Sequence, residues 1–158
     1  MQKAIGSEIL NDLNGYDIED LAPGMSASMS KEISNADIVM FSEVSGDVNP
    51  VHLDDAYAAT TPFGGRIAHG MLSASLISAV IANRLPGPGT VYLDQRLSFK
   101  APVRPGDVVE AVVTIKEVQD RGRVVLETEC RVGDTVVISG EALVKVGSAA
   151  RRNQKPRA

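Results

Sequence analysis

The first residues that could do chemistry are Asp47 and His52, the two ends of the segment Asp-Val-Asn-Pro-Val-His. Gly46 permits backbone conformations that other residues resist, and Pro50 fixes φ in the turn, so the two side chains can reach the same side of a rigid bend. An aspartate and a histidine that meet at one water can take a proton from it and return one to a neighbouring carbon. The alternative is a turn capped by Asp47 and Asn49, with His52 as a buried imidazole.

A second chemical feature is a glycine at the start of an apolar segment. Gly70 opens a run of apolar and small residues that continues to Asn83 and stops before Pro86. The first N–H groups of a helix have no partner within the helix, and the helix dipole is positive there. This terminus can therefore bind a carbonyl oxygen that gains negative charge in a reaction. The alternative is that Gly70 is an ordinary residue at a helix start.

The second half of the chain predicts strands at 91–99, 108–118, 123–132 and 135–146, because apolar and polar residues alternate there. Gly133-Asp134 is a two-residue loop of the kind that closes tight hairpins. Short turns between the strands predict an antiparallel meander, with 91–99 half-buried. The residues expected to face inward are Val91, Leu93, Leu97, Phe99, Val109, Ala111, Val113, Ile115, Val124, Leu126, Thr128, Cys130, Val136, Ile138, Ala142 and Val144.

The first half is helical and irregular. Ser34 and Asp37 have the spacing of a capping box, and the helix that they begin is expected to end at Ser45-Gly46, with an apolar stripe. The alternation of methionine and alanine with serine at 25–29 predicts an edge strand. The helix at 70–83 is apolar on nearly every side, so we expect it to be buried all round. The stripe of the first helix consists of Ala36, Val39, Met40 and Val44.

Both halves together predict the α+β class. An antiparallel sheet wrapped around one central buried helix satisfies the strand pattern and the apolar helix at once, and this arrangement is the hot-dog fold. We expect three parts: an N-terminal extension at 1–20, the hot-dog domain at 21–147, and a basic, disordered tail at 148–158.

Composition narrows the functional classes. The chain has 158 residues, a net charge of −4 and one cysteine. A chain of this length supports its own core, and a single cysteine excludes an internal disulfide framework and cysteine-based metal clusters. The acidic balance disfavours nucleic acid as a partner. No run of apolar residues is long enough to span a membrane, and the start does not resemble a signal peptide, so we expect a cytoplasmic protein.

At this point the residues match a known family. The chain resembles the MaoC-like dehydratases, specifically the single-domain (R)-specific enoyl-CoA hydratases. The matching segments are 45–54 (SGDVNPVHLD), 67–76 (IAHGMLSASL), 91–103 (VYLDQRLSFKAPV) and 105–107 (PGD). The likeness extends from about Asp20 to Val146.

The resemblance implies a hot-dog dimer that adds water to trans-2-enoyl-CoA to give (R)-3-hydroxyacyl-CoA, without a cofactor or metal. Asp47 and His52 match the catalytic pair of the family, and Asn49 matches a residue that helps to hold the loop. Gly70 matches the backbone donor to the thioester oxygen. Ser78 matches a serine in the hydrogen-bond network of the site, although a helix serine that bonds to its own backbone is an alternative.

Other residues carry weaker expectations. The cationic side chains are candidates to bind the phosphates of coenzyme A, with surface solvation as the alternative for each. The depth of the acyl pocket is expected to depend on the size of the side chains on the helix face within one turn of Ser78. His69 is expected to be structural and Cys130 to lie in the core. Tyr57 and Phe63 are expected over the pocket, where they either shape the acyl tunnel or cover the sheet. The phosphate candidates are Arg66, Arg84, Lys100 and Arg104, and the pocket candidates are Ala74, Ile77 and Ile81.

Two other functions remain open. The first is a hot-dog thioesterase, which would direct water at the carbonyl carbon instead. The second is a non-catalytic acyl-thioester binding module, or the dehydratase partner of a larger assembly. The intact Asp47/His52 pair argues against both. A single hot-dog domain leaves a sheet edge open, so we expect a homodimer, or an oligomer of dimers, with a continuous sheet.

Overall fold

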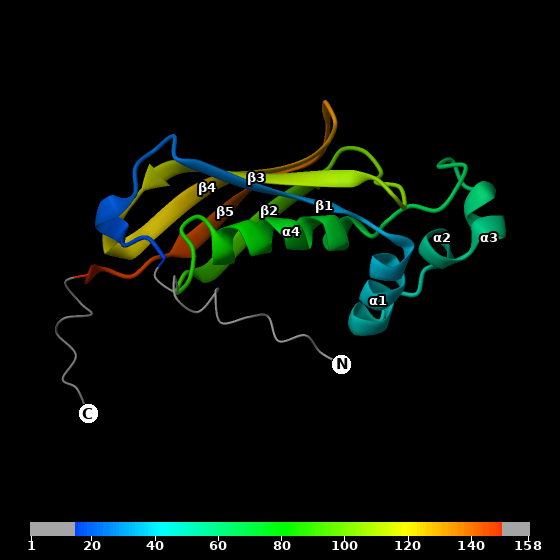
Figure 1. Cartoon of the computed structure of the whole chain (residues 1–158), viewed down its shortest axis with the longest axis horizontal. Coiled ribbons are helices and arrows are strands. Elements are labelled where there is room, and N and C mark those ends of the chain that lie inside the picture. Colours follow the sequence, from blue (N-terminus) through cyan, green and yellow to red (C-terminus); the bar gives the residue numbers. More distant parts are fainter. Residues whose placement is uncertain (1–14, 150–158) are drawn as a thin grey trace.

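The computed structural model describes residues 15–149. A five-stranded antiparallel sheet carries the long helix α4 (Gly70–Asn83) on one face, and three short helices gather beyond one end of the sheet (Figure 1). The strands are β1 (Ser26–Glu32), β2 (Val91–Phe99), β3 (Val108–Val118), β4 (Arg123–Val132) and β5 (Thr135–Lys145). The other helices are α1 (Asn35–Ser45), α2 (Pro50–Leu53) and α3 (Asp55–Ala59), with 3-10 turns η2 (Ile18–Asp20) and η3 (Asp120–Gly122).

The core lies between α4 and the inner face of the sheet. The predicted inward residues of β3 and β4 are all buried, which confirms the alternation. In β5, Ile138, Ala142 and Val144 are buried as expected, but Val136 is half-buried and Val137 replaces it, because the β4–β5 register shifts between Cys130 and Arg131. Each aliphatic side chain buried here contributes about 1.5–3 kcal/mol of transfer free energy. The helix contributes Leu72, Ala74, Leu76, Ile77, Val80 and Ile81.

The strand order corrects the predicted meander. The order is β1-β3-β4-β5-β2, so β3, β4 and β5 form a meander while β2 pairs with the far side of β5. Pro102 and Pro105 lack the N–H that a central strand needs, and the chain from 100 to 107 instead crosses the end of the sheet. Val103 accepts a hydrogen bond from the N–H of Ala68 at 2.7 Å. This crossing segment thereby lies beside the start of α4.

Two expectations of burial are wrong for the single chain. Strand β2 is an edge strand with no partner on its outer side among the described residues, and Val91, Leu93 and Phe99 are 44–54% exposed. Helix α4 is not buried all round, because the sheet covers only one of its sides. Its exposed residues are Gly70, Met71, Ser75, Ser78, Ala82 and Asn83.

Helix α1 begins and ends where the sequence predicts. The Ser34/Asp37 capping box is present in both directions, and Gly46 ends the helix with φ of 78°. Its apolar stripe, however, faces outward: Val39, Met40 and Val44 are exposed, while Ile38 and Ser42 are buried. The reason is that α1 lies beyond the end of the sheet (Figure 1), so only the side toward the start of α4 is covered.

The expected N-terminal extension and basic tail lie largely outside the described residues, and their boundaries stay predictions. Within the described part, Tyr16 and Ile18 donate backbone hydrogen bonds to Pro86 and Gly147, at 2.8 and 2.9 Å. None of the helices in residues 15–149 is long and apolar enough to cross a membrane.

Candidate active site

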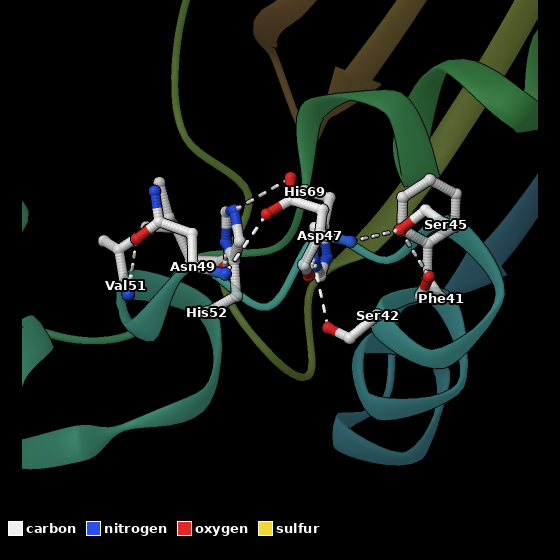
Figure 2. A network of polar contacts seen from close by, with 9 residues as sticks. Phe41, Ser42, Ser45, Asp47, Asn49, Val51, His52 and His69 are labelled. Atoms are coloured by element: carbon white, nitrogen blue, oxygen red, sulfur yellow. Dashed lines mark hydrogen bonds and ion pairs between the residues drawn. The ribbon is translucent and has the colours of Figure 1, made fainter.

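The loop that carries Asp47 is held by its own side chains (Figure 2). The Asp47 carboxylate accepts the Asn49 N–H at 3.2 Å, and the Asn49 side-chain oxygen accepts the Val51 N–H at 3.1 Å. Asn49 thus caps α2, whose first residue is Pro50. These local bonds, typical of Asx turns, explain why the sequence folds into a fixed bend here. The bend turns His52 back toward Asp47.

His52 and Asp47 face each other across a short gap. Nε2 of His52 lies 4.0 Å from Oδ2 of Asp47, and the side chains are 10% and 50% exposed. Nδ1 of His52 lies 2.8 Å from the carbonyl oxygen of Ile67. Because a carbonyl can only accept, Nδ1 carries the proton of neutral His52. The Nε2 lone pair therefore faces the carboxylate side of the site.

A second histidine joins this pair. The His69 ring stacks on the His52 ring, with centroids 3.8 Å apart and planes 31° apart. Nε2 of His69 lies 3.0 Å from the Asp47 carbonyl oxygen and 3.2 Å from the Ser42 hydroxyl (Figure 2). The sequence predicted a structural role for His69, but not this contact with the Asp47 loop, since only the fold brings residues 47 and 69 together.

Asp47, His52 and His69 carry groups that could bind a metal ion. One potential ligand atom from each of Asp47, His52 and His69 lies within 4.8 Å of the others. Imidazole lone pairs lie in the ring plane, and zinc binds nitrogen at about 2.0–2.1 Å. Two rings stacked at 3.8 Å with planes 31° apart cannot direct both lone pairs at one such point. The arrangement fits acid/base chemistry better than a metal site.

The start of α4 forms the opposite element of the site. The backbone N–H groups of Gly70 and Met71 have no hydrogen-bond partner within residues 15–149. The ring of Phe99, at the end of β2, lies against Gly70, and a Cβ added to Gly70 would come within 2.6 Å of it. Glycine is therefore required for this approach. Phe99 was predicted only as an inward strand residue, and no pattern in the sequence links it to Gly70.

A cavity of about 460 Å³ brings these elements together. Asp47, His52 and Gly70 all line it, and the crossing segment after β2 forms another wall. Most other lining side chains are apolar, so a polar reaction centre adjoins an apolar compartment. The complete lining is Asp47, His52, Phe63, Ile67, Ala68, His69, Gly70, Met71, Ser73, Phe99, Lys100, Ala101, Pro102, Val103 and Ile138.

The candidates for acyl binding lie elsewhere. Ala74, Ile77 and Ile81 are buried in the core between α4 and the sheet, and Ser78 is exposed on the outward side of α4. None of these four residues lines the cavity of the single chain.

The phosphate candidates divide into two groups. Arg66 binds Asp55 at 2.7 Å and Asn35 at 2.5 Å. Arg104 binds the carbonyl of Phe63, and Arg84 binds that of Ser28, both at 2.5 Å. These arginines fasten loops and strands. Lys100, by contrast, lines the cavity.

Solved structures identify the fold. The unliganded R-hydratase of Pseudomonas aeruginosa has a TM-score of 0.81 and 44% identity, over 85% of this chain and 87% of that chain. The (R)-hydratase of Aeromonas caviae involved in PHA biosynthesis has a TM-score of 0.79 and 42% identity, over 81% and 98%. The described sheet and helix form the hot-dog fold, as the sequence predicted.

Sequence relatives identify the family. The match to the family described as MaoC like domain covers residues 21–138. The 3-hydroxybutyryl-CoA dehydratase of Methylorubrum extorquens is 53% identical over 139 residues, 87% of this chain and 88% of that protein. The (R)-specific enoyl-CoA hydratase of Rhodospirillum rubrum is 52% identical over 137 residues, 86% and 95%. The chain belongs to the MaoC-like domain family.

Proposed function

We propose that the protein reversibly hydrates trans-2-enoyl-CoA to (R)-3-hydroxyacyl-CoA, with Asp47 and His52 as the catalytic pair. One observation carries the proposal: Oδ2 of Asp47 and Nε2 of His52 lie 4.0 Å apart in the same cavity as the N–H of Gly70, which has no hydrogen-bond partner among residues 15–149. The names of the two relatives at 52–53% identity support a coenzyme A thioester as the substrate, and the name of the (R)-specific enoyl-CoA hydratase supports the (R) product.

The pair presents two acceptors to one water. His52 donates through Nδ1, so its Nε2 accepts, and the ionised carboxylate of Asp47 accepts as well. A water placed about 2.8 Å from both atoms fits a gap of 4.0 Å and donates both of its protons. Its oxygen lone pair is then free to attack carbon C3 of the enoyl group. In the proposed step the pair orders the nucleophile by itself, so we expect the reaction to need no metal or cofactor.

The reaction balances within this site. The water oxygen bonds to C3, one water proton passes to the Asp47/His52 pair, and the C2=C3 electrons move to the thioester oxygen. The N–H of Gly70, at the positive end of α4, stabilises that enolate oxygen. The electron pair then returns to C2, which takes the proton from the pair. In the proposal the Asp47/His52 pair holds this proton between the two steps.

Coenzyme A is the proposed thioester handle. The relatives at 52–53% identity are named for coenzyme A substrates, whereas one named for acyl carrier protein, from Arabidopsis thaliana, is 36% identical. Lys100 is exposed and lines the cavity, so its ammonium group can bind a phosphate of the ligand. A cytoplasmic location is consistent with this substrate and with a single cysteine that is fully buried.

We further infer a homodimer joined through the outer edge of β2. Its backbone groups are an open template for a second strand, and Val91 and Leu93 beside them are exposed. In such a dimer the outward side of α4, with Ser78, would also gain a neighbour. Light scattering is expected to give twice the chain mass for the wild type and a single chain mass for the V91K/L93K variant. A monomeric wild type would contradict the inference.

The experiment that tests the function follows the enoyl absorbance on mixing the protein with trans-2-butenoyl-CoA and longer enoyl-CoAs, with chiral analysis of the product. We expect the (R) alcohol, and a loss of about 10²–10⁴-fold in kcat for Asp47→Asn and for His52→Ala. Release of free thiol with the enoyl absorbance unchanged would instead establish a thioesterase. Binding without either reaction would leave an acyl-thioester binding module.

A further inference from the structure

We propose that His69 is a positioning residue for this reaction: through one imidazole it holds the main chain of Asp47 and supports the ring of His52. It thereby fixes both members of the pair relative to Gly70, the residue that follows it. This inference rests on the proposed function, since it adds a residue to the same site.

The side chain of His69 points away from its own helix. His69 is the N-cap residue of α4 and is 2% exposed, but its side chain makes no capping bond to its own helix. It turns to α1 and the loop that follows it instead. Its Nε2 lies 3.0 Å from the Asp47 carbonyl oxygen in the loop and 3.2 Å from the Ser42 hydroxyl in α1. One side chain therefore joins the start of α4, the end of α1 and the loop of the acid/base pair.

The two histidines carry their protons on different ring nitrogens. The Asp47 carbonyl only accepts, so His69 carries its proton on Nε2. His52 carries its proton on Nδ1, because its partner is the carbonyl of Ile67. The two stacked histidines are therefore opposite tautomers. Each holds a backbone carbonyl of the site, and only His52 directs a lone pair at the substrate side.

The stacked ring of His69 restricts the orientation of the His52 ring. The single hydrogen bond at Nδ1 leaves the His52 ring able to turn about that bond. The stacked ring of His69, with centroids 3.8 Å apart, covers one face and opposes this rotation. The centroid of the Phe41 ring in turn lies 4.9 Å from the centroid of the His69 ring, so Phe41 supports His69. A displacement of about 1 Å in a reacting group can cost about 10²-fold in rate.

A matched set of variants separates the hydrogen bond from the ring. Glutamine places its amide N–H near the position of Nε2, whereas asparagine is shorter and reaches only about as far as Nδ1. Phenylalanine keeps the stacked ring and loses the donor. We expect His69→Asn and His69→Phe to lower kcat by about 30–100-fold with KM within about threefold, and His69→Gln to recover at least about threefold over His69→Asn.

The protein offers a second readout that needs no activity. The chain has two histidines, so nitrogen-15 NMR of the side chains gives two ring systems. We expect one Nδ1–H and one Nε2–H tautomer in the wild type. In His69→Asn, the remaining histidine should lose its single tautomer and show averaged nitrogen shifts, while His69→Gln should restore the pattern more closely.

Several results would overturn the proposal. One is a kcat of His69→Asn within about twofold of the wild type; another is equal loss in the glutamine and asparagine variants of equal melting temperature. If the variants do not fold, the wild-type spectrum decides, because two histidines with the same tautomer contradict the geometry. Absence of hydration by the wild type would refute the proposed function, while the tautomers would still test the placement of His69.

Discussion

Within β3 and β4, alternate side chains at 109–115 and 124–130 are buried on the side of the sheet that faces α4. From Phe41 to Ile67, by contrast, the chain is held mainly by hydrogen bonds of its own polar groups. The sheet is regular and apolar inside. The segment from Phe41 to Ile67 instead has exposed apolar residues such as Val44 and Val48, which are 82% and 65% exposed. Its backbone is fixed by caps at Ser34, Asn49 and Asp54.

This difference separates stability from chemistry. Apolar burial in the sheet supplies most of the folding free energy, because it scales with the area removed from water. Caps and turn bonds supply about 1 kcal/mol each, but they fix directions, which a carboxylate and an imidazole need in order to meet at one water. Damage to the two regions should therefore have different consequences.

The largest expected difference compares Asp47→Asn with Leu126→Ala. Asp47 is half exposed, so its replacement should change the free energy of unfolding by less than about 1 kcal/mol while kcat falls by about 10²–10⁴-fold. Leu126 is fully buried in β4, so its truncation should cost about 2–5 kcal/mol of stability. Urea unfolding and steady-state kinetics on both variants test this. An equal loss of kcat per folded molecule in Asp47→Asn and Leu126→Ala would contradict this separation of stability from chemistry.

The thiol of Cys130 tests how closed the sheet region is. Burial, with a smaller contribution from Glu129, raises the pKa of Cys130 to about 12. The ordinary thiol pKa is about 8.5, so labelling by iodoacetamide at pH 8 should be about 10³-fold slower in the folded protein than in urea. The rate is measured by mass spectrometry. Fast labelling of the folded protein would mean that the sheet opens readily.

The contact of Gly70 with Phe99 lies where the sheet, at the end of β2, meets the active site, at the start of α4. In Gly70→Ala the new methyl group would lie 2.6 Å from the Phe99 ring, which must move across the start of α4. We expect a loss of about 10²-fold in kcat/KM. In the double variant with Phe99→Ala the clash is gone, and part of the loss should be recovered. If the losses in kcat/KM of Gly70→Ala and Phe99→Ala simply multiply in the double variant, the Phe99 ring and the start of α4 act independently.

The smallest expected effect is at the capping box of α1. The pKa of Asp37 is lowered by its hydrogen bond from the Ser34 backbone, with Lys31 and the Ser34 hydroxyl adding to it. The carboxylate therefore stabilises the fold above its unfolded pKa of about 3.8, and this stability is lost as pH falls through the folded value. Asp37→Asn should cost about 1 kcal/mol at pH 7, and the cost should shrink as the pH falls through the lowered pKa of Asp37 in the folded protein. Unfolding curves across this pH range, with Glu43→Gln on the same helix as control, measure it.

The sequence alone predicted the regular elements well. The bounds of β2, β3, β4 and α4 agree with the expected ranges, because alternation and turn residues are local signals. The motif around Asp47 and His52 also indicated its own bend, since Asn49 and Pro50 act within a few residues. The family was recognisable from the same short segments.

Tertiary structure decided what local signals do not carry. The pairing of β2 with β5 depends on how the chain from 100 to 107 crosses the sheet, and a strand pattern is the same for either neighbour. The outward stripe of α1 and the open side of α4 follow from which surfaces remain to cover them. The bond from His69 to the Asp47 carbonyl joins residues 22 apart through a backbone atom that every residue has. Periodicity indicates which side of an element is apolar, but only packing in three dimensions determines its partner.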